Sequence, residues 1–140
     1  MSEKPLSCVL LADRHHGLAE RMRGLLETAF ETVVMVADET SLLEGADRLH
    51  PDVAIVDLSL SKGNGLIWLG KLRERNPELK VIVISIHDED NVRRAATAAG
   101  ADAFVLKNAI VTDLIPAVEL VRADRNNGSS ANGEEGEEEF

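Results

Sequence analysis

Five short apolar runs, each followed by a segment with helical periodicity, constrain the fold of this chain more than any other feature. The runs lack alternation of apolar and polar residues, which is typical of strands buried on both faces of a parallel sheet. They cover residues 8–12, 32–37, 53–56, 81–86 and 103–106. Five repetitions of strand then helix predict one α/β domain, with a five-stranded parallel sheet covered by helices on both faces.

The segments after these runs carry apolar residues at spacings that line one face of a helix. The predicted helices cover residues 16–30, about 40–49, 66–75, about 88–100 and 112–124. Gly100 is expected to end the fourth helix as its C-cap. Pro116 is placed in or near the first turn of the last helix, where its missing N–H does least harm. Residues 61–65 are predicted to form a flexible loop from their composition.

The composition excludes several classes of function. The net charge is −10, and the glutamates between residues 134 and 139 supply five of those negative charges. The rest of the chain is mildly acidic and has no excess of positive charge that would attract the phosphates of DNA or RNA. We therefore expect no direct nucleic-acid binding by this chain. The single cysteine, Cys8, fits a reducing compartment. With no signal peptide and no apolar run long enough for a membrane span, a cytoplasmic location is expected.

The composition changes after residue 125, and this change sets the predicted domain boundary. Residues 6–125 are expected to form the folded domain. Residues 126–140 are poor in apolar side chains and rich in Gly, Ser, Asn and Glu, which predicts a disordered acidic tail. An expression tag or a truncation scar explains the same composition equally well.

Polar residues follow four of the predicted strands, and right-handed crossovers bring all strand ends to one edge of the sheet. They are Asp13, Arg14, Asp57, Ser85 and Lys107. Taken alone, Asp57 fits a turn or helix-capping aspartate slightly better than a catalytic one. Two carboxylates, a hydroxyl and a lysine on one rim, however, predict a site for a phosphoryl group.

These residues resemble the receiver domain of two-component response regulators, especially the subfamily that usually precedes a helix-turn-helix output domain. The resemblance covers about residues 6–124 and rests on an ordered set of motifs. The motifs are LLAD at the first strand, PDVAIVDLSL, the downstream Gly65, VIVISIHDE and GADAFVLKN. It implies a flavodoxin-like, doubly wound five-stranded parallel sheet flanked by five helices.

The resemblance also implies roles for the rim residues. Asp57 would be the phosphoacceptor, taking a phosphoryl group from a sensor histidine kinase, a phosphotransfer protein or a small phosphodonor. Ser85 would bind a phosphoryl oxygen and shift on activation, Lys107 would neutralise phosphoryl charge, and Phe104 would occupy the aromatic switch position. A core aromatic is the alternative interpretation of Phe104. Such a domain accepts a phosphoryl group and loses it by autodephosphorylation; it is not a turnover enzyme.

Arg14 departs from the family pattern, which carries a second acid at this position as the main carboxylate ligand of Mg²⁺. Asp13, Asp57 and the backbone carbonyl of Ser59 remain as implied ligands. A guanidinium has no oxygen to give to a hard cation, so Mg²⁺ binding is expected to be weakened or lost. We expect Arg14 to act instead as a fixed cation that pairs with Asp57 or Asp13.

Three histidines flank the predicted site and raise the alternative of a transition-metal site. They are His15, His16 and His87. Adjacent histidines rarely point at the same ion, and no cysteine or spaced carboxylate completes a ligand shell. The sequence therefore favours solvated or capping histidines.

Three functions remain open, of which the leading one is a receiver that switches a protein-binding face when Asp57 is phosphorylated. That face would combine the fourth helix, the fifth strand and the last helix, would contact an output domain or partner protein, and would also suit a homodimer. The alternative is a pseudo-receiver, an interaction module that Arg14 holds in one state without Mg²⁺ or phosphorylation. A small phosphatase-like enzyme is disfavoured, since no general acid lies near Asp57 and no Gly-rich phosphate loop is present.

Overall fold

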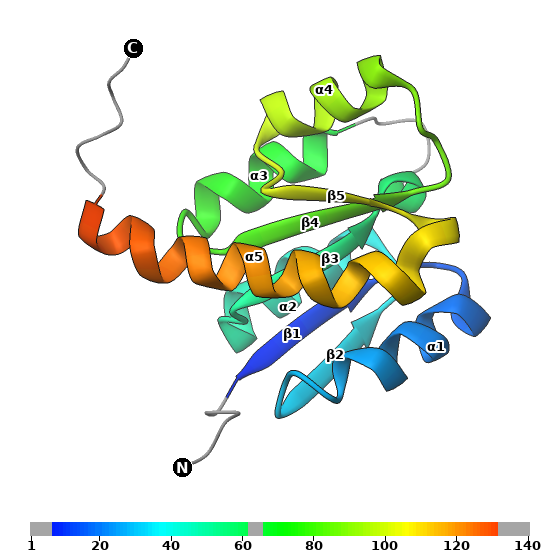
Figure 1. Ribbon diagram of the computed structural model, residues 1–140, viewed down its shortest axis with the longest axis horizontal. Coiled ribbons are helices and arrows are strands. Elements are labelled where there is room, and N and C mark those ends of the chain that lie inside the picture. The colour runs from blue at the N-terminus through cyan, green and yellow to red at the C-terminus, as the bar shows by residue number, and fades with distance from the viewer. Residues whose placement is uncertain (1–6, 62–65, 132–140) are drawn as a thin grey trace.

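The computed structural model describes residues 7–61 and 66–131, and five parallel strands form its centre (Figure 1). Their order in the sheet is β2-β1-β3-β4-β5, the doubly wound, flavodoxin-like order. The strands are β1 (Cys8–Ala12), β2 (Thr32–Val36), β3 (Val53–Asp57), β4 (Lys80–Ser85) and β5 (Ala103–Leu106). The predicted fold class is confirmed.

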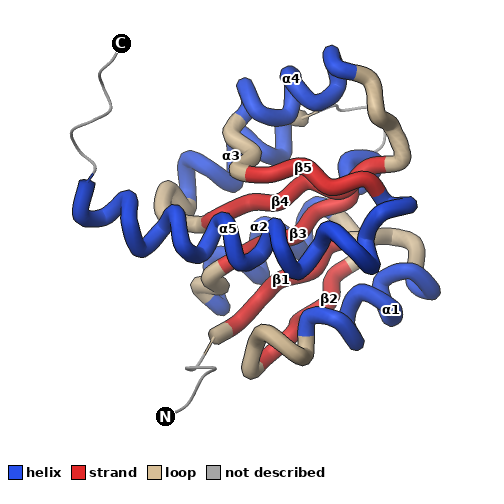
Figure 2. The backbone as a smooth tube through the Cα atoms, viewed as in Figure 1, coloured by secondary structure: helices blue, strands red, loops and turns tan. Residues whose placement is uncertain are grey.

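Five helices lie on the two faces of this sheet (Figure 2). They are α1 (His16–Leu26), α2 (Glu39–Leu49), α3 (Ile67–Arg75), α4 (Asp90–Ala99) and α5 (Ile110–Ala131). Two short 3₁₀ helices follow strands at the carboxyl edge, η1 (Leu58–Ser61) and η2 (Lys107–Ala109). Buried residues of α1 and α5 pack in one core layer, and those of α2, α3 and α4 pack in the other.

The central strand β3 shows how the apolar runs build both layers. All five of its residues are buried. Val53 and Ile55 pack with α1 and α5, whereas Ala54 and Val56 pack with α2 and α3, because successive side chains point to opposite faces of a sheet. This double burial places Asp57 at the end of a fully packed strand, where the residue is 2% exposed.

The end of the first helix and the start of the last helix differ from the prediction. The first helix ends at Leu26 rather than Phe30, because a turn over residues 27–29 brings Phe30 into the core, where it is 1% exposed. The last helix begins at Ile110, directly after η2, so Pro116 lies inside it and not in its first turn. A proline there removes one helical hydrogen bond, which the packing of α5 on the sheet must offset.

The last helix also continues past residue 125, the predicted end of the domain. It extends to Ala131, and the predicted disorder of the acidic tail stays a prediction. Once a helix is nucleated on a packed segment, each further residue adds a hydrogen bond at little extra cost. The remaining tail residues and loop residues 62–65 lie outside the described part of the chain. Within residues 7–61 and 66–131, no helix is both long enough and apolar enough to cross a membrane.

Candidate functional site

Two buried carboxylates share one lysine at the carboxyl edge of the sheet. Asp13 follows β1, Asp57 ends β3, and Lys107 begins η2 directly after β5. The Lys107 Nζ lies 3.3 Å from Asp13 Oδ2 and 3.3 Å from Asp57 Oδ1, and the three side chains are 9%, 0% and 3% exposed, respectively. Buried charges need partners to offset their desolvation, so the ammonium is what allows both carboxylates to lie here.

The turn after β3 supplies further hydrogen bonds to Asp57. The Ser59 backbone N–H donates to Asp57 Oδ1 at 3.3 Å, and the Ser59 hydroxyl donates to Asp57 Oδ2 at 2.8 Å. This is an Asx-type arrangement, in which an aspartate carboxylate accepts from the backbone two residues on. It fixes the direction of the carboxylate relative to the strand.

A pocket of about 270 Å³ opens beside Asp57. Its lining comes from the ends of β3 and β4 and from the segments that follow β1, β3, β4 and β5: His15, Asp57, Leu58, Ser59, Ser85, Ile86, His87 and Lys107. The Ser85 side-chain oxygen accepts the His87 backbone N–H at 2.8 Å, and Ser85 is only 1% exposed. The predicted trio of Asp57, Ser85 and Lys107 therefore surrounds one cavity that is large enough for a phosphoryl group.

Arg14 does not take the place predicted for it. Its Nη1 donates to the backbone carbonyl oxygen of Ser59 at 3.5 Å, in an exposed contact. Among the described residues, the basic groups in contact with the two carboxylates are Lys107 and His15. The expected pairing of Arg14 with Asp57 or Asp13 is wrong, because those partners already occupy the carboxylates while the long guanidinium side chain reaches across to η1.

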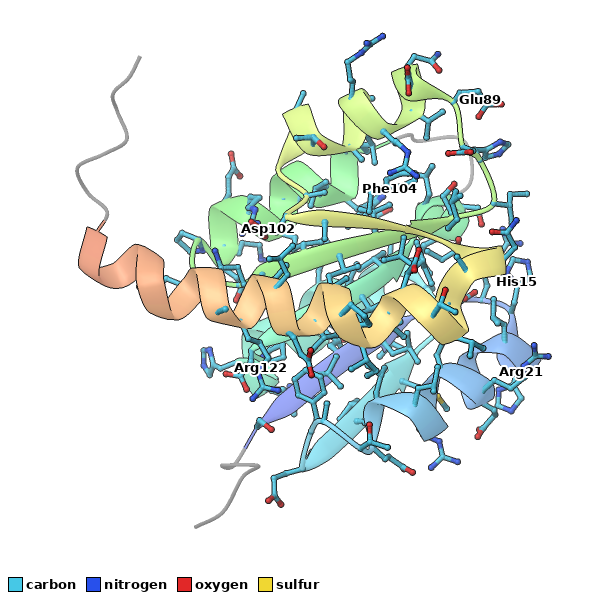
Figure 3. The ribbon with its side chains drawn as sticks, viewed as in Figure 1. His15, Arg21, Glu89, Asp102, Phe104 and Arg122 are labelled. Atoms are coloured by element: carbon cyan, nitrogen blue, oxygen red, sulfur yellow. The ribbon has the colours of Figure 1, made fainter. Side chains whose placement is uncertain are left out.

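His15 is the residue that sequence reasoning undervalued. Its Nδ1 lies 3.1 Å from Asp13 Oδ1 and 3.5 Å from Asp57 Oδ2, and Figure 3 shows it at the carboxyl edge of the sheet. The only available signal was its position two residues after Asp13, whose Oδ1 accepts the His15 backbone N–H at 2.8 Å. His16 and His87 instead lie beside surface glutamates, as predicted for solvated histidines.

Phe104 lies on β5 (Figure 3) and is half-buried against the layer of α2, α3 and α4. The guanidinium carbon of Arg93, on α4, lies 4.8 Å from the centre of the Phe104 ring, within the range of a cation–π contact. Arg93 is thus a second residue that the sequence did not single out. The contact links α4 to β5 on the face predicted for output.

The donor set does not fit the Mg²⁺ site that the resemblance implies. Mg²⁺ requires near-octahedral oxygen ligands, but Arg14 replaces one carboxylate with a group that has no lone pair to offer. The same guanidinium donates to the Ser59 carbonyl, which would have been another ligand. The metal-ligating groups that do converge are Asp13, His15 and Asp57, one atom from each lying within 4.8 Å of the others.

Comparison with known proteins agrees with this geometry. Residues 9–119 match the family model of the response regulator receiver domain. The chain belongs to this family. As a receiver domain of a two-component system, it is 31% identical over 115 residues to the transcriptional regulatory protein DegU of Brevibacillus brevis. It is 32% identical over 127 residues to the nitrate/nitrite response regulator protein NarL of Escherichia coli K12.

The matched segment covers 81% of this chain and 49% of DegU, and 88% of this chain and 58% of NarL. This receiver domain thus spans about half the length of the curated relatives it matches. Among solved structures, it resembles the signal receiver domain of the putative response regulator NarL from Mycobacterium tuberculosis, with a TM-score of 0.73 and 26% identity. That match covers 89% of this chain and 98% of the other. The family predicted from the sequence motifs is confirmed.

Proposed function

We propose that Asp57 accepts a phosphoryl group from a sensor histidine kinase or phosphotransfer protein, and that its phosphorylation switches a protein-binding face. The observation that carries this proposal is the position of the Lys107 ammonium, 3.3 Å from Asp57 Oδ1. Ser85 and Asp57 line the same pocket. An electrophilic phosphorus placed there meets a nucleophile, a cation and a hydroxyl at once.

The residues divide the chemistry between them. A carboxylate oxygen of Asp57 attacks phosphorus, forming an O–P bond as the P–N bond to the donor imidazole breaks. The imidazole retains the electron pair of that bond and takes up a proton. Lys107 stabilises negative charge on the phosphoryl oxygens, and the Ser85 hydroxyl donates to one of them in place of its present contact. No step is assigned to Mg²⁺, since its ligand set does not fit.

We propose that the output face consists of α4, β5 and α5. Movement of Ser85 toward a phosphoryl oxygen would shift the end of β4, and the neighbouring Phe104 would change its packing. The Arg93 contact with Phe104 would then be broken or re-formed, which biases two pre-existing arrangements of α4. Contact with an output domain, or homodimerisation, through this face follows from the same proposal.

A second candidate function is a pseudo-receiver that binds partners without phosphorylation. The observation in its favour is the contact of Arg14 Nη1 with the Ser59 carbonyl, since it bridges the turns after β1 and β3 where an activating ion would otherwise bind. In this alternative, Lys107 and Arg14 hold the carboxyl edge of the sheet permanently in one conformation. The retained Asp57, Ser85 and Lys107 argue for the first candidate.

Phosphodonor treatment separates the two functions. The full chain is incubated with acetyl phosphate, or with beryllofluoride, in buffers containing no added metal, Mg²⁺ or Mn²⁺. We expect intact mass spectrometry to show one added phosphoryl group in wild type and none in Asp57→Asn, with changed amide spectra at α4 and β5. Asp47→Asn, on the surface of α2, is the matched control and should be phosphorylated like wild type.

Absence of an adduct and of spectral changes in every buffer would reject phosphorylation and leave the pseudo-receiver. An adduct that persists in Asp57→Asn would place the acceptor elsewhere. Arg14→Asp adds a further arm, because restoring an acid is expected to raise Mg²⁺ affinity. An unchanged Mg²⁺ titration in that variant would mean that Arg14 is not what weakens the site.

A further inference from the structure

We propose that α4 moves about its C-terminal end, because Arg73 on α3 holds that end while the N-terminal end is weakly attached. Figure 3 shows the two ends of the helix, marked by Glu89 and Asp102. Arg73 is then a positioning residue for the output face, although it lies at the opposite edge of the sheet from the phosphoryl pocket. The moved state rests on the proposed function, whereas the difference between the two ends belongs to the unmodified chain.

The Arg73 guanidinium joins α3 to three segments at the amino edge of the sheet. Its Nε and Nη2 donate to the carbonyl oxygen of Gly100, the C-cap of α4, at 3.0 and 2.7 Å. Its Nη1 donates to the carbonyl oxygen of Leu79, and Nη2 also donates to the Asp102 carboxylate. Hydrogen bonds from a charged donor are stronger than neutral ones. The guanidinium therefore ties the end of α4 to the starts of β4 and β5.

The groups that Arg73 binds are themselves held in place. The Asp102 carboxylate accepts the Val81 backbone N–H at 2.9 Å, and the Asp102 backbone N–H donates to the Val81 carbonyl at 2.7 Å. Ala96, the buried residue of α4, lies in the turn before Gly100 and is 0% exposed. The C-terminal end of α4 is thus fixed both by the core and by the Arg73 contacts.

The N-terminal end of α4 has weaker attachments. Residues 86–91 are all exposed, and the Glu89 side chain makes no capping hydrogen bond to the described part of the chain. The Arg93 Nη2 lies 3.3 Å from Asp88 Oδ1, but these side chains are 40% and 69% exposed, and surface ion pairs of this kind contribute little. Arg93 also contacts the ring of Phe104, through the cation–π contact described above.

The weakly attached end is also the end connected to the phosphoryl pocket. β4 ends at Ser85, whose side-chain oxygen accepts the His87 backbone N–H at 2.8 Å. Rotation of Ser85 toward a phosphoryl oxygen would break this contact and change the path of residues 86–89. A helix that is fixed at one end responds by turning about that end. The displacement is therefore largest near Arg93 and smallest where Arg73 binds.

The experiment is amide hydrogen exchange of the unmodified full chain, followed residue by residue in ¹⁵N NMR spectra. Arg94 and Ala95 form the N-terminal pair of α4 amides, Ala98 and Ala99 form the C-terminal pair, and Ile55 in β3 reports the core. In wild type, we expect protection factors at least about tenfold higher for the C-terminal pair than for the N-terminal pair. A helix attached equally at both ends would show equal protection of the two pairs.

Two variants act on opposite ends of the helix. Arg73→Met should lower the protection of the C-terminal pair at least about tenfold relative to Ile55, and that of the N-terminal pair by no more than about threefold. Arg93→Met should lower only the N-terminal pair, and it tests the same asymmetry in a chain that keeps Arg73. Arg75→Met is the matched control on α3, because the ion pair of Arg75 with Asp47 is exposed, and both pairs should exchange as in wild type.

The moved state is tested in the chain treated with beryllofluoride. We expect the largest changes of amide shifts at residues 86–95 and the smallest at residues 98–102. An absence of any spectral change would count against phosphorylation of Asp57, and exchange in the unmodified chain would still decide the role of Arg73.

Three results would overturn the proposal. They are equal protection of the two pairs in wild type, a loss in Arg73→Met that both pairs and Ile55 share equally, and beryllofluoride shifts at residues 98–102 as large as at 86–95. The second result would mean that Arg73 stabilises the domain as a whole without positioning α4.

Discussion

Replacement of Lys107 by methionine tests whether a single ammonium holds the two buried carboxylates in place. Its Nζ is 3.3 Å from an oxygen of Asp13 and 3.3 Å from an oxygen of Asp57. At an effective dielectric constant of about 20, two unit charges at that separation attract by about 5 kcal/mol. Desolvation and repulsion between the carboxylates offset much of this gross energy. Removing one partner from a buried ion pair typically costs about 3–5 kcal/mol.

We therefore expect Lys107→Met to lower the free energy of unfolding by about 3–5 kcal/mol, a large share of the roughly 5–15 kcal/mol typical of a domain. The assay is urea unfolding followed by fluorescence of Trp68, the only tryptophan in a chain without tyrosine. With a urea dependence of about 2 kcal/mol per molar, the midpoint should fall by about 2 M.

Lys71→Met is the matched control. Its Nζ lies 3.7 Å from Glu39, but the lysine side chain is 53% exposed, and surface ion pairs contribute only about 0–1 kcal/mol. If Lys107→Met costs no more than this control, the buried-pair reasoning is refuted. As a second arm, Lys107→Met combined with Asp57→Asn should recover about 1–3 kcal/mol relative to the sum of the single losses, because the unpaired charge is gone.

Two further predictions concern the scaffold. Gly100→Ala should lower the free energy of unfolding by about 1–3 kcal/mol, because Gly100 has φ 118° and an added Cβ would lie 2.9 Å from Arg73 Cγ. Gly70→Ala, with open space around it, should be neutral or slightly stabilising. Equal changes in melting temperature for Gly100→Ala and Gly70→Ala would contradict this. At α2, the Ser41 backbone N–H lowers the pKa of Asp38 below 3.8, so the stabilisation is complete above pH 3.8 and is lost as the pH falls through the lower folded-state pKa. Asp38→Asn should weaken the dependence of the unfolding free energy on pH in this acidic range. An unchanged pH dependence in the variant would show that the Asp38 cap does not cause it.

The sequence alone determined the architecture and the gathering of polar residues at one edge. Aliphatic runs without alternation can be satisfied only by strands covered on both faces, and right-handed crossovers then place every strand end on the same side. Asp13, Asp57, Ser85 and Lys107 were predictable for that reason. Their motifs and spacing also indicated the family.

Side-chain directions at that edge were decided by the tertiary structure. Arg14 and His15 are consecutive, and nothing in their order says which one faces the carboxylates. The Asp13 carboxylate accepts the His15 backbone N–H, which places His15 beside the two acids, while Lys107, which follows the distant strand β5, forms ion pairs with both of them.

The helix ends likewise depended on packing. Burial of Phe30 shortens α1, and the direct passage from η2 into α5 puts Pro116 inside a helix. The periodicity of the sequence indicates which face of a segment is apolar, but it does not indicate which other elements pack against that face. The sequence therefore determined that a carboxylate site exists on this rim, and the fold decided that its neighbours are an ammonium and an imidazole, with the guanidinium directed to a carbonyl.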